Sequence, residues 1–432
     1  QNPHPYQSER MRIGISAVFS LLIALSISTF NNAGQAVAFV PASRNVAWTS
    51  VRMSMSETET SAASTSSSSN ERNKLDPEYQ AVKDSLLETI KAAIETKSLI
   101  APLSYFVEEY FAASNDAARS GSDLDISPKA VADRIMSSIQ LGMKHGLGSD
   151  TYLFDVRHVA LRGKNPEEEG GNTFDFYEFG CDFFRPTMDL KNSIVMGKEN
   201  AEKAFAQIEA GENVVFLANH QSEADPQVFS ILLEAIGRGE EAAQVTYVAG
   251  HKVTTDPLAI PFSMGRNLLC IHSKKHINVD PDSKAIKQRQ NLSAMSSMLA
   301  MLKEGGASLW VAPSGGRDRR NLETGEVPIA PFDQKTVDMF RLMGNKSKKP
   351  THFYPLAMVS YDLCPPPDFI DPGVGEQRNV RFVPIGINIM DEVENVGGVE
   401  SRHLFTENAE KACDEGYKEL LEAINKKQDG EE

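Results

Sequence analysis

The segment NHQSEADP carries a histidine and an aspartate at a spacing that suits acid–base chemistry. His220 and Asp225 lie five positions apart, between two apolar runs. A tight loop can bring the carboxylate onto one imidazole nitrogen, which fixes the tautomer and leaves the other nitrogen to accept a proton. Such a base typically accelerates a reaction about 10²–10⁴-fold. The pair therefore predicts general-base catalysis on a substrate that brings its own hydroxyl group.

Other interpretations of these residues stay open. Asp225 precedes a proline and a helical apolar pattern, so its carboxylate also suits the N-cap of a helix. The segment GHKVTTDP repeats the spacing with His251 and Asp256, and spacing alone does not choose between the two pairs. Ser222 lies inside the first loop, but it lacks the G-x-S-x-G surroundings of a serine nucleophile.

Basic residues follow two other apolar runs. In VAPSGGRDR, Arg317 and Arg319 are two positions apart, so in an extended loop their side chains point to the same side. Asp318 between them either orients one arginine or faces water. The segment HSKKHIN adds Lys275 and His276, which meet the arginines if the two preceding strands are neighbours. Because guanidinium groups bind phosphate and carboxylate, these residues predict a pocket for a small dianion.

Short apolar segments precede these loops and alternate with helical patterns. They are bounded by turn residues and predict strands over 213–218, 245–250, 267–273, 308–313, 352–361 and 380–387. Strands that alternate with helices indicate an α/β sheet, and in such sheets ligands gather at the carboxyl ends of the strands. Each of the suspected site segments falls at such an end.

A helical module precedes the strands. Apolar residues at helical spacing predict helices that begin near Pro77, Pro102 and Pro128, since proline is favoured in the first helical turn. Three or four helices in so short a stretch indicate a small helical bundle over 73–158. The α/β part then covers 159–432.

The first part of the chain, 1–72, has the composition of a targeting region and a linker. Residues 11–38 have the basic start, apolar stretch and small residues of a signal peptide. Residues 39–72 begin with a hydroxyl-rich, acid-poor stretch typical of transit peptides and end in a serine-rich linker. This arrangement resembles the bipartite presequence of algae with secondary plastids and predicts delivery to the plastid stroma. Plain secretion is the alternative.

The overall composition excludes some classes of function. The chain has 432 residues and a formal net charge of −15, which argues against general nucleic-acid binding because that requires a basic face. Its four cysteines are scattered without a C-x-x-C pair, so we expect reduced, mostly buried thiols rather than a zinc site or disulfides. Neither a P-loop nor a metal-binding motif is present, so we expect no metal and no cofactor.

Four motifs occur in an order that resembles one enzyme family. NHQSEADP, GHKVTTDPLAIPFSMGRNLLCIHSKKHIN, LWVAPSGGRDR and FYPLAMVSYDLCPPP are similar to segments of the soluble plastid glycerol-3-phosphate acyltransferases, and the resemblance covers about 75–425. It implies a mixed α/β sheet flanked by helices. It also implies transfer of a fatty acyl group from acyl carrier protein, or from acyl-CoA, to the sn-1 hydroxyl of glycerol 3-phosphate, which gives 1-acylglycerol 3-phosphate.

The resemblance also assigns roles to single residues. His220 becomes the general base and Asp225 the group that orients it. The phosphate of the acceptor is assigned to Lys275, His276, Arg317 and Arg319. The resemblance implies no cofactor and no membrane span in the mature chain.

Three rival activities remain. The first is acyl transfer to lysophosphatidate. Where the wider superfamily usually has Glu-Gly-Thr-Arg, this chain has PSGGR with Ser314 and Gly316, which counts against that activity. The second is a thioesterase or phosphohydrolase in which His220 activates water. The third is a lipid-binding protein without catalytic activity.

An acidic acyl carrier protein calls for a basic docking surface on its enzyme. The segment NKSKKP, with Lys346, Lys348 and Lys349, is one candidate for that surface. A loop whose lysines are simply solvated is the alternative interpretation of the same segment.

Overall fold

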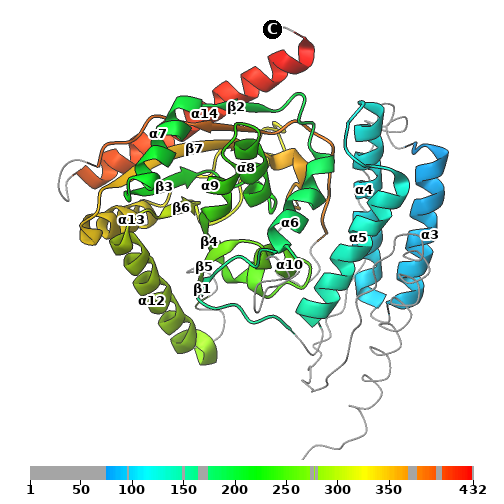
Figure 1. The fold of residues 1–432 in the computed structure, drawn as a ribbon, viewed down its shortest axis with the longest axis horizontal. Coiled ribbons are helices and arrows are strands. Elements are labelled where there is room, and N and C mark those ends of the chain that lie inside the picture. Colours follow the sequence, from blue (N-terminus) through cyan, green and yellow to red (C-terminus); the bar gives the residue numbers. More distant parts are fainter. Residues whose placement is uncertain are drawn as a thin grey trace, which may run out of the picture.

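The structure is a computed structural model (Figure 1). It describes residues 74–94, 97–147, 151–163, 174–272, 277, 281–367, 377–395 and 401–430. The predicted presequence and linker lie outside the described residues, and so do Lys275 and His276. Among the described helices, none combines the length and the apolar character needed to cross a membrane.

Three helices come first and pack on one another. They are α3 (Pro77–Ala93), α4 (Lys97–Arg119) and α5 (Pro128–Gly142). Two of them begin at proline as predicted, and Ser127 caps α5 by accepting a hydrogen bond from the N–H of Ala130. The predicted start of α4 at Pro102 is wrong, because this helix already begins at Lys97. Pro102 lacks the N–H for one backbone hydrogen bond of this helix.

One mixed sheet of eight strands follows, in the order β1-β5-β4-β6-β3-β7-β8-β2. The strands are β1 (Arg157–His158), β2 (Ile194–Met196), β3 (Asn213–Ala218), β4 (Thr246–Gly250), β5 (Asn267–Ile271), β6 (Ser308–Val311), β7 (Thr351–Val359) and β8 (Gly386–Ile389). From β5 to β7 all neighbouring strands are parallel, whereas β1 and β8 pair antiparallel with β5 and β7. The predicted class, a mixed α/β sheet with flanking helices, is confirmed.

The central strand β3 is buried on both faces, because successive side chains of a strand point to opposite sides. Val214 and Phe216 belong to one apolar cluster, while Val215 and Leu217 belong to another. The first cluster receives side chains from α6 (Phe176–Phe184), α7 (Lys198–Glu209), α8 (Asp225–Glu234) and α9 (Gly239–Gln244). The second receives side chains from α12 (Pro281–Glu304), α13 (Gln334–Ser347) and α14 (Arg402–Asp429). Helices therefore cover the sheet on both sides.

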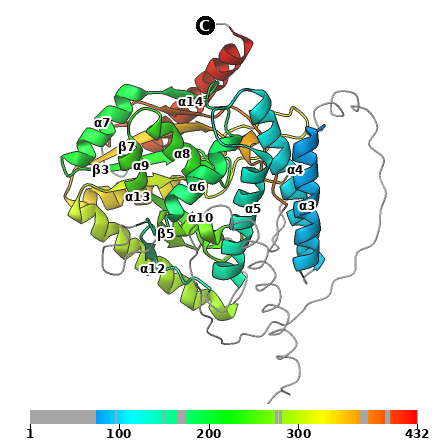
Figure 2. The same cartoon turned by 45° about the vertical axis from the view of Figure 1, so that its right-hand side comes forward.

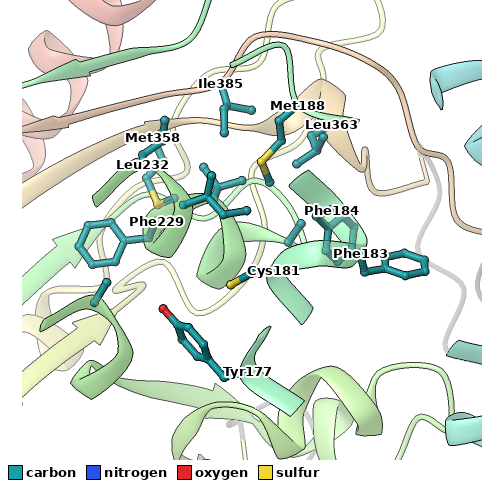
Figure 3. Close-up of a cluster of buried hydrophobic side chains, with 14 of the residues drawn as sticks. Tyr177, Cys181, Phe183, Phe184, Met188, Phe229, Leu232, Met358, Leu363 and Ile385 are labelled. Atoms are coloured by element: carbon teal, nitrogen blue, oxygen red, sulfur yellow. The ribbon is translucent and has the colours of Figure 1, made fainter. Parts of the chain in front are cut away.

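The N-terminal helices share the first of these clusters, and in both views α4 and α5 lie between α3 and α6 (Figures 1 and 2). The buried hydroxyl of Tyr110 on α4 donates a hydrogen bond to the carbonyl of Phe183 on α6, at 2.5 Å. Figure 3 shows Cys181 and Phe184 of α6 and Phe229 of α8 as members of one buried cluster. All four cysteines are described; they are buried and none is in a disulfide, as predicted. The division into a helical bundle and an α/β part stays a prediction.

One predicted strand is displaced, and one condition stated for the basic pocket is not met. The strand predicted over 380–387 is displaced, since β8 begins only at Gly386. Pro384 within the predicted range has no N–H to donate to a neighbouring strand. The strands before the two basic segments, β5 and β6, are not neighbours, because β4 lies between them. At about 4.8 Å per strand step, this separates them by roughly 10 Å.

Candidate active site

The carboxyl ends of five parallel strands lie along one edge of the sheet. Because β6 and β7 both pair with β3 in parallel, the loops that follow these three strands lie side by side. They carry His220 after β3, Arg317 and Arg319 after β6, and Ser360 after β7. Chemistry-bearing residues from three distant parts of the chain therefore gather at this edge.

The predicted histidine–aspartate pair is formed. His220 Nδ1 lies 2.8 Å from Asp225 Oδ2. The aspartate side chain is fully buried, whereas the histidine side chain is 27% exposed. Trp310 on β6 meets the imidazole edge-on, with the ring centroids 5.7 Å apart. Since a carboxylate only accepts, it holds a proton on Nδ1 and leaves Nε2 as the nitrogen that can take one up.

Asp225 does not cap the following helix, so that alternative is wrong. The helix α8 begins at Asp225 itself, with Ala224 at the N-cap position. The carboxylate instead accepts hydrogen bonds from the backbone N–H groups of Gln221 (2.9 Å) and Ser222 (3.0 Å), and from the Ser360 hydroxyl (2.6 Å). Together with His220, four donors therefore hold the Asp225 carboxylate in place, out of contact with solvent.

The second pair with the same spacing is arranged differently. His251 Nδ1 lies 3.0 Å from the Thr254 hydroxyl. Asp256 accepts hydrogen bonds from the Leu258 N–H at 3.0 Å and from Arg378 Nη2 at 2.7 Å. The imidazole and the carboxylate are thus bound to different partners, and only the first pair has the geometry of an oriented base.

A partly buried charge network links the loop after β3, which carries His220 and Glu223, to Arg317 and Arg378. Arg317 Nη1 lies 3.5 Å from Glu223 Oε1, and Arg378 Nε donates a hydrogen bond to Glu223 Oε2 at 2.9 Å. Through its contact with Asp256, Arg378 also binds the loop after β4. Burial acts to raise the pKa of Glu223, but Arg378 and Arg317 outweigh it and lower the pKa to about 2. Glu223 is therefore charged at any physiological pH.

Sequence reasoning missed Arg378. It stands apart from every recognisable motif and reaches the site only through the fold, because it binds residues more than 100 positions earlier in the chain. Glu223 was visible within NHQSEADP, but nothing in the spacing gave it a partner.

The loop after β6 carries Arg317 and Arg319 and is called the arginine loop. It also differs from expectation at Asp318. This side chain is fully buried, so it neither faces water nor orients an arginine. It accepts hydrogen bonds from the Asn219 side-chain amide (3.1 Å) and the Ala330 N–H (2.9 Å), and burial raises its pKa to about 6. The Asp318 N–H donates to the carbonyl of His220 at 2.6 Å. Asp318 thus links the arginine loop to the loop after β3 that carries His220, here called the histidine loop. Arg319 donates a hydrogen bond to the carbonyl of Pro367 at 2.8 Å.

The sequence that carries most of this site matches a known protein family. Residues 192–359 match a family model described as Acyltransferase. The chain is 37% identical over 358 residues to the chloroplastic glycerol-3-phosphate acyltransferase of Arabidopsis thaliana, which covers 79% of this chain and 73% of the relative. The enzymes of the same name from Spinacia oleracea and Phaseolus vulgaris are 36% and 35% identical, over 65% and 78% of this chain and 58% and 69% of their own lengths.

Among solved structures, the chain is similar to the 1-acyl-sn-glycerophosphate (LPA) acyltransferase PlsC from Thermotoga maritima. The TM-score is 0.35 and the sequence identity is 16%, over 57% of this chain and 78% of that one. Agreement at this level is too low to support any structural argument.

Proposed function

Since the chain belongs to the chloroplastic glycerol-3-phosphate acyltransferases, we propose that it acylates the sn-1 hydroxyl of glycerol 3-phosphate and uses acyl carrier protein as the acyl donor. The observation that carries the proposal is the oriented base His220 at the strand edge that also presents Arg317 and Arg319. Acyl-CoA is the alternative donor, since it offers the same thioester.

The reaction needs a base, an acceptor held beside it and a leaving thiolate. His220 Nε2 takes the proton from the acceptor hydroxyl while its oxygen attacks the thioester carbonyl, and Asp225 stabilises the imidazolium that forms. The carbon–sulfur bond then breaks, and the departing thiolate receives the proton from the imidazolium. No acyl-enzyme forms, so the buried cysteines stay outside the chemistry.

The phosphate group aims the acceptor. Arg317 and Arg319 would bind it, with Lys275 and His276, which lie outside the described residues, as further ligands. Holding the phosphate converts a collision between two molecules into a reaction within one complex, which lowers the entropic part of the barrier. This role is supported by the position of both arginines next to the histidine loop.

The direct test is an assay with labelled glycerol 3-phosphate and either acyl carrier protein or CoA thioesters as donors. We expect 1-acylglycerol 3-phosphate as the product. Free fatty acid without acylglycerol phosphate would support the thioesterase instead. Preferred acylation of lysophosphatidate would support the rival acceptor.

The relatives are named chloroplastic, which supports a plastid location for this chain. We propose the stroma as the compartment, reached through a signal peptide over 11–38 and a transit-like segment over 39–72. We also propose a helical domain over 73–158, followed by the acyltransferase domain over 159–432.

The Ser360 hydroxyl is expected to be a positioning group for Asp225. Ser360→Ala should lower kcat about tenfold, because Asp225 loses one of its four hydrogen bonds and the base is held less firmly. The KM for glycerol 3-phosphate should stay unchanged. Ser347→Ala is the matched control, since it removes another buried hydroxyl at the other edge of the sheet and should leave kcat unaltered. Equal losses in both variants would contradict the positioning role.

A further inference from the structure

The lysine-rich segment suggested by the sequence is poorly placed for docking a donor. Lys346, Lys348 and Lys349 precede the first residue of β7, whereas Ser360 directly follows its last. A strand rises about 3.3 Å per residue, so the nine residues of β7 separate the two ends by roughly 30 Å. The lysines therefore lie at the edge of the sheet opposite to His220.

The helix α12 reaches the same edge of the sheet as His220. It connects β5 to β6 and, at about 1.5 Å per residue, its 24 residues span roughly 36 Å. The second half packs on the sheet through buried Ala294, Met298 and Leu302. Two hydrogen bonds of 2.8 Å join Asn291, near its middle, to the backbone of His272 just after β5. The turns before Asn291 consequently extend past the carboxyl end of β5.

The part of α12 that extends past the sheet exposes an unusual combination of side chains. Lys284 and Arg289 are exposed on it. Between and beyond them, Ile286 is 59% exposed and Leu292 is 71% exposed. In a chain with a net charge of −15, a surface that joins basic groups to exposed large aliphatic side chains suits an acidic partner.

On the premise of the proposed function, we infer that residues 282–292 of α12 form the docking surface for acyl carrier protein. This partner is strongly acidic, so it complements Lys284 and Arg289, while Ile286 and Leu292 supply apolar contact. From β5 to β3 there are three strand steps, or roughly 14 Å. A carrier protein bound at α12 would therefore lie beside His220 at the same edge of the sheet. Its flexible prosthetic arm would have to pass only the ends of β4 and β6 to bring the acyl group to His220.

The test compares two double charge reversals with both donors. Lys284→Glu/Arg289→Glu changes the proposed surface, and Lys346→Glu/Lys349→Glu makes the same change in net charge at the opposite edge. All four side chains are exposed, so both variants should fold, which thermal melting will verify. We expect the α12 variant to lose tenfold or more in kcat/KM with the carrier-protein donor and less than twofold with acyl-CoA. The control should lose less than threefold with either donor.

A third variant tests the apolar part of the surface. Ile286→Gln should raise the KM for the carrier-protein donor about threefold to tenfold and leave the KM for acyl-CoA unchanged. Equal losses in both charge-reversal variants would mean that net charge alone matters, and losses confined to the control would place docking at the lysine segment. Either result, or no loss at all, overturns the inference while the proposed function stands. Absence of glycerol 3-phosphate acylation by the unaltered protein with both donors would instead overturn the proposed function.

Discussion

His220→Ala is expected to lower kcat about 10³-fold while the KM for glycerol 3-phosphate changes less than about threefold. The imidazole is the group at this edge whose second nitrogen is left to accept a proton, because Asp225 engages Nδ1. In the proposed assignment the phosphate is bound by other residues, so substrate binding should survive. Steady-state rates with both substrates varied, together with thermal melting, will separate a lost base from a lost fold.

The second histidine supplies the matched control. His251→Ala removes the same side chain from the other H-x-x-x-x-D segment, where the imidazole contacts Thr254 and the aspartate binds Arg378. We expect less than a threefold change in kcat. If His251→Ala were as damaging as His220→Ala, the base would be wrongly assigned. A fully active His220→Ala would contradict the proposed mechanism itself.

The contacts that the sequence predicted correctly are those between residues close together in the chain. His220 and Asp225 are joined within one loop, so their spacing alone predicts the contact. Strand β3 was predicted with correct ends, since an apolar run buried on both faces is a strong local signal. The two histidine segments after β3 and β4 and the arginine segment after β6 also lie at the carboxyl ends of parallel strands, where ligands gather.

The contacts that the sequence missed depend on the order of the strands. Asp318 is buried because the loops after β3 and β6 are adjacent, and its own segment holds no sign of that. The insertion of β4 between β5 and β6 likewise has no local signature. Arg378 meets Glu223 and Asp256 only when the loops after β3 and β4 are brought together. Contacts between residues far apart in the chain are therefore the part of the site that a single sequence conceals.

The charge network around Arg378 predicts a loss that a second substitution should reverse. Arg378→Met leaves Glu223 with Arg317 as its nearest guanidinium. If Arg317 binds the substrate phosphate as proposed, the Glu223 carboxylate then competes with the phosphate for that arginine and also repels the phosphate. A repulsion of about 1.4–2.8 kcal/mol corresponds to a rise of roughly 10–100-fold in the KM for glycerol 3-phosphate. The donor KM should not change, and kcat should fall much less than the KM rises.

Glu223→Gln in the Arg378→Met background decides whether this explanation holds. If Arg378 acts by neutralising Glu223, removal of the carboxylate charge should return the KM to within about fivefold of the original value, because Arg317 is again available to the phosphate. A purely structural role predicts no recovery of the KM, since the double variant loses still more contacts of the histidine loop. Asp256 stays without its arginine in both variants, so thermal melting should show a similar loss of stability in each, and only the KM should separate them.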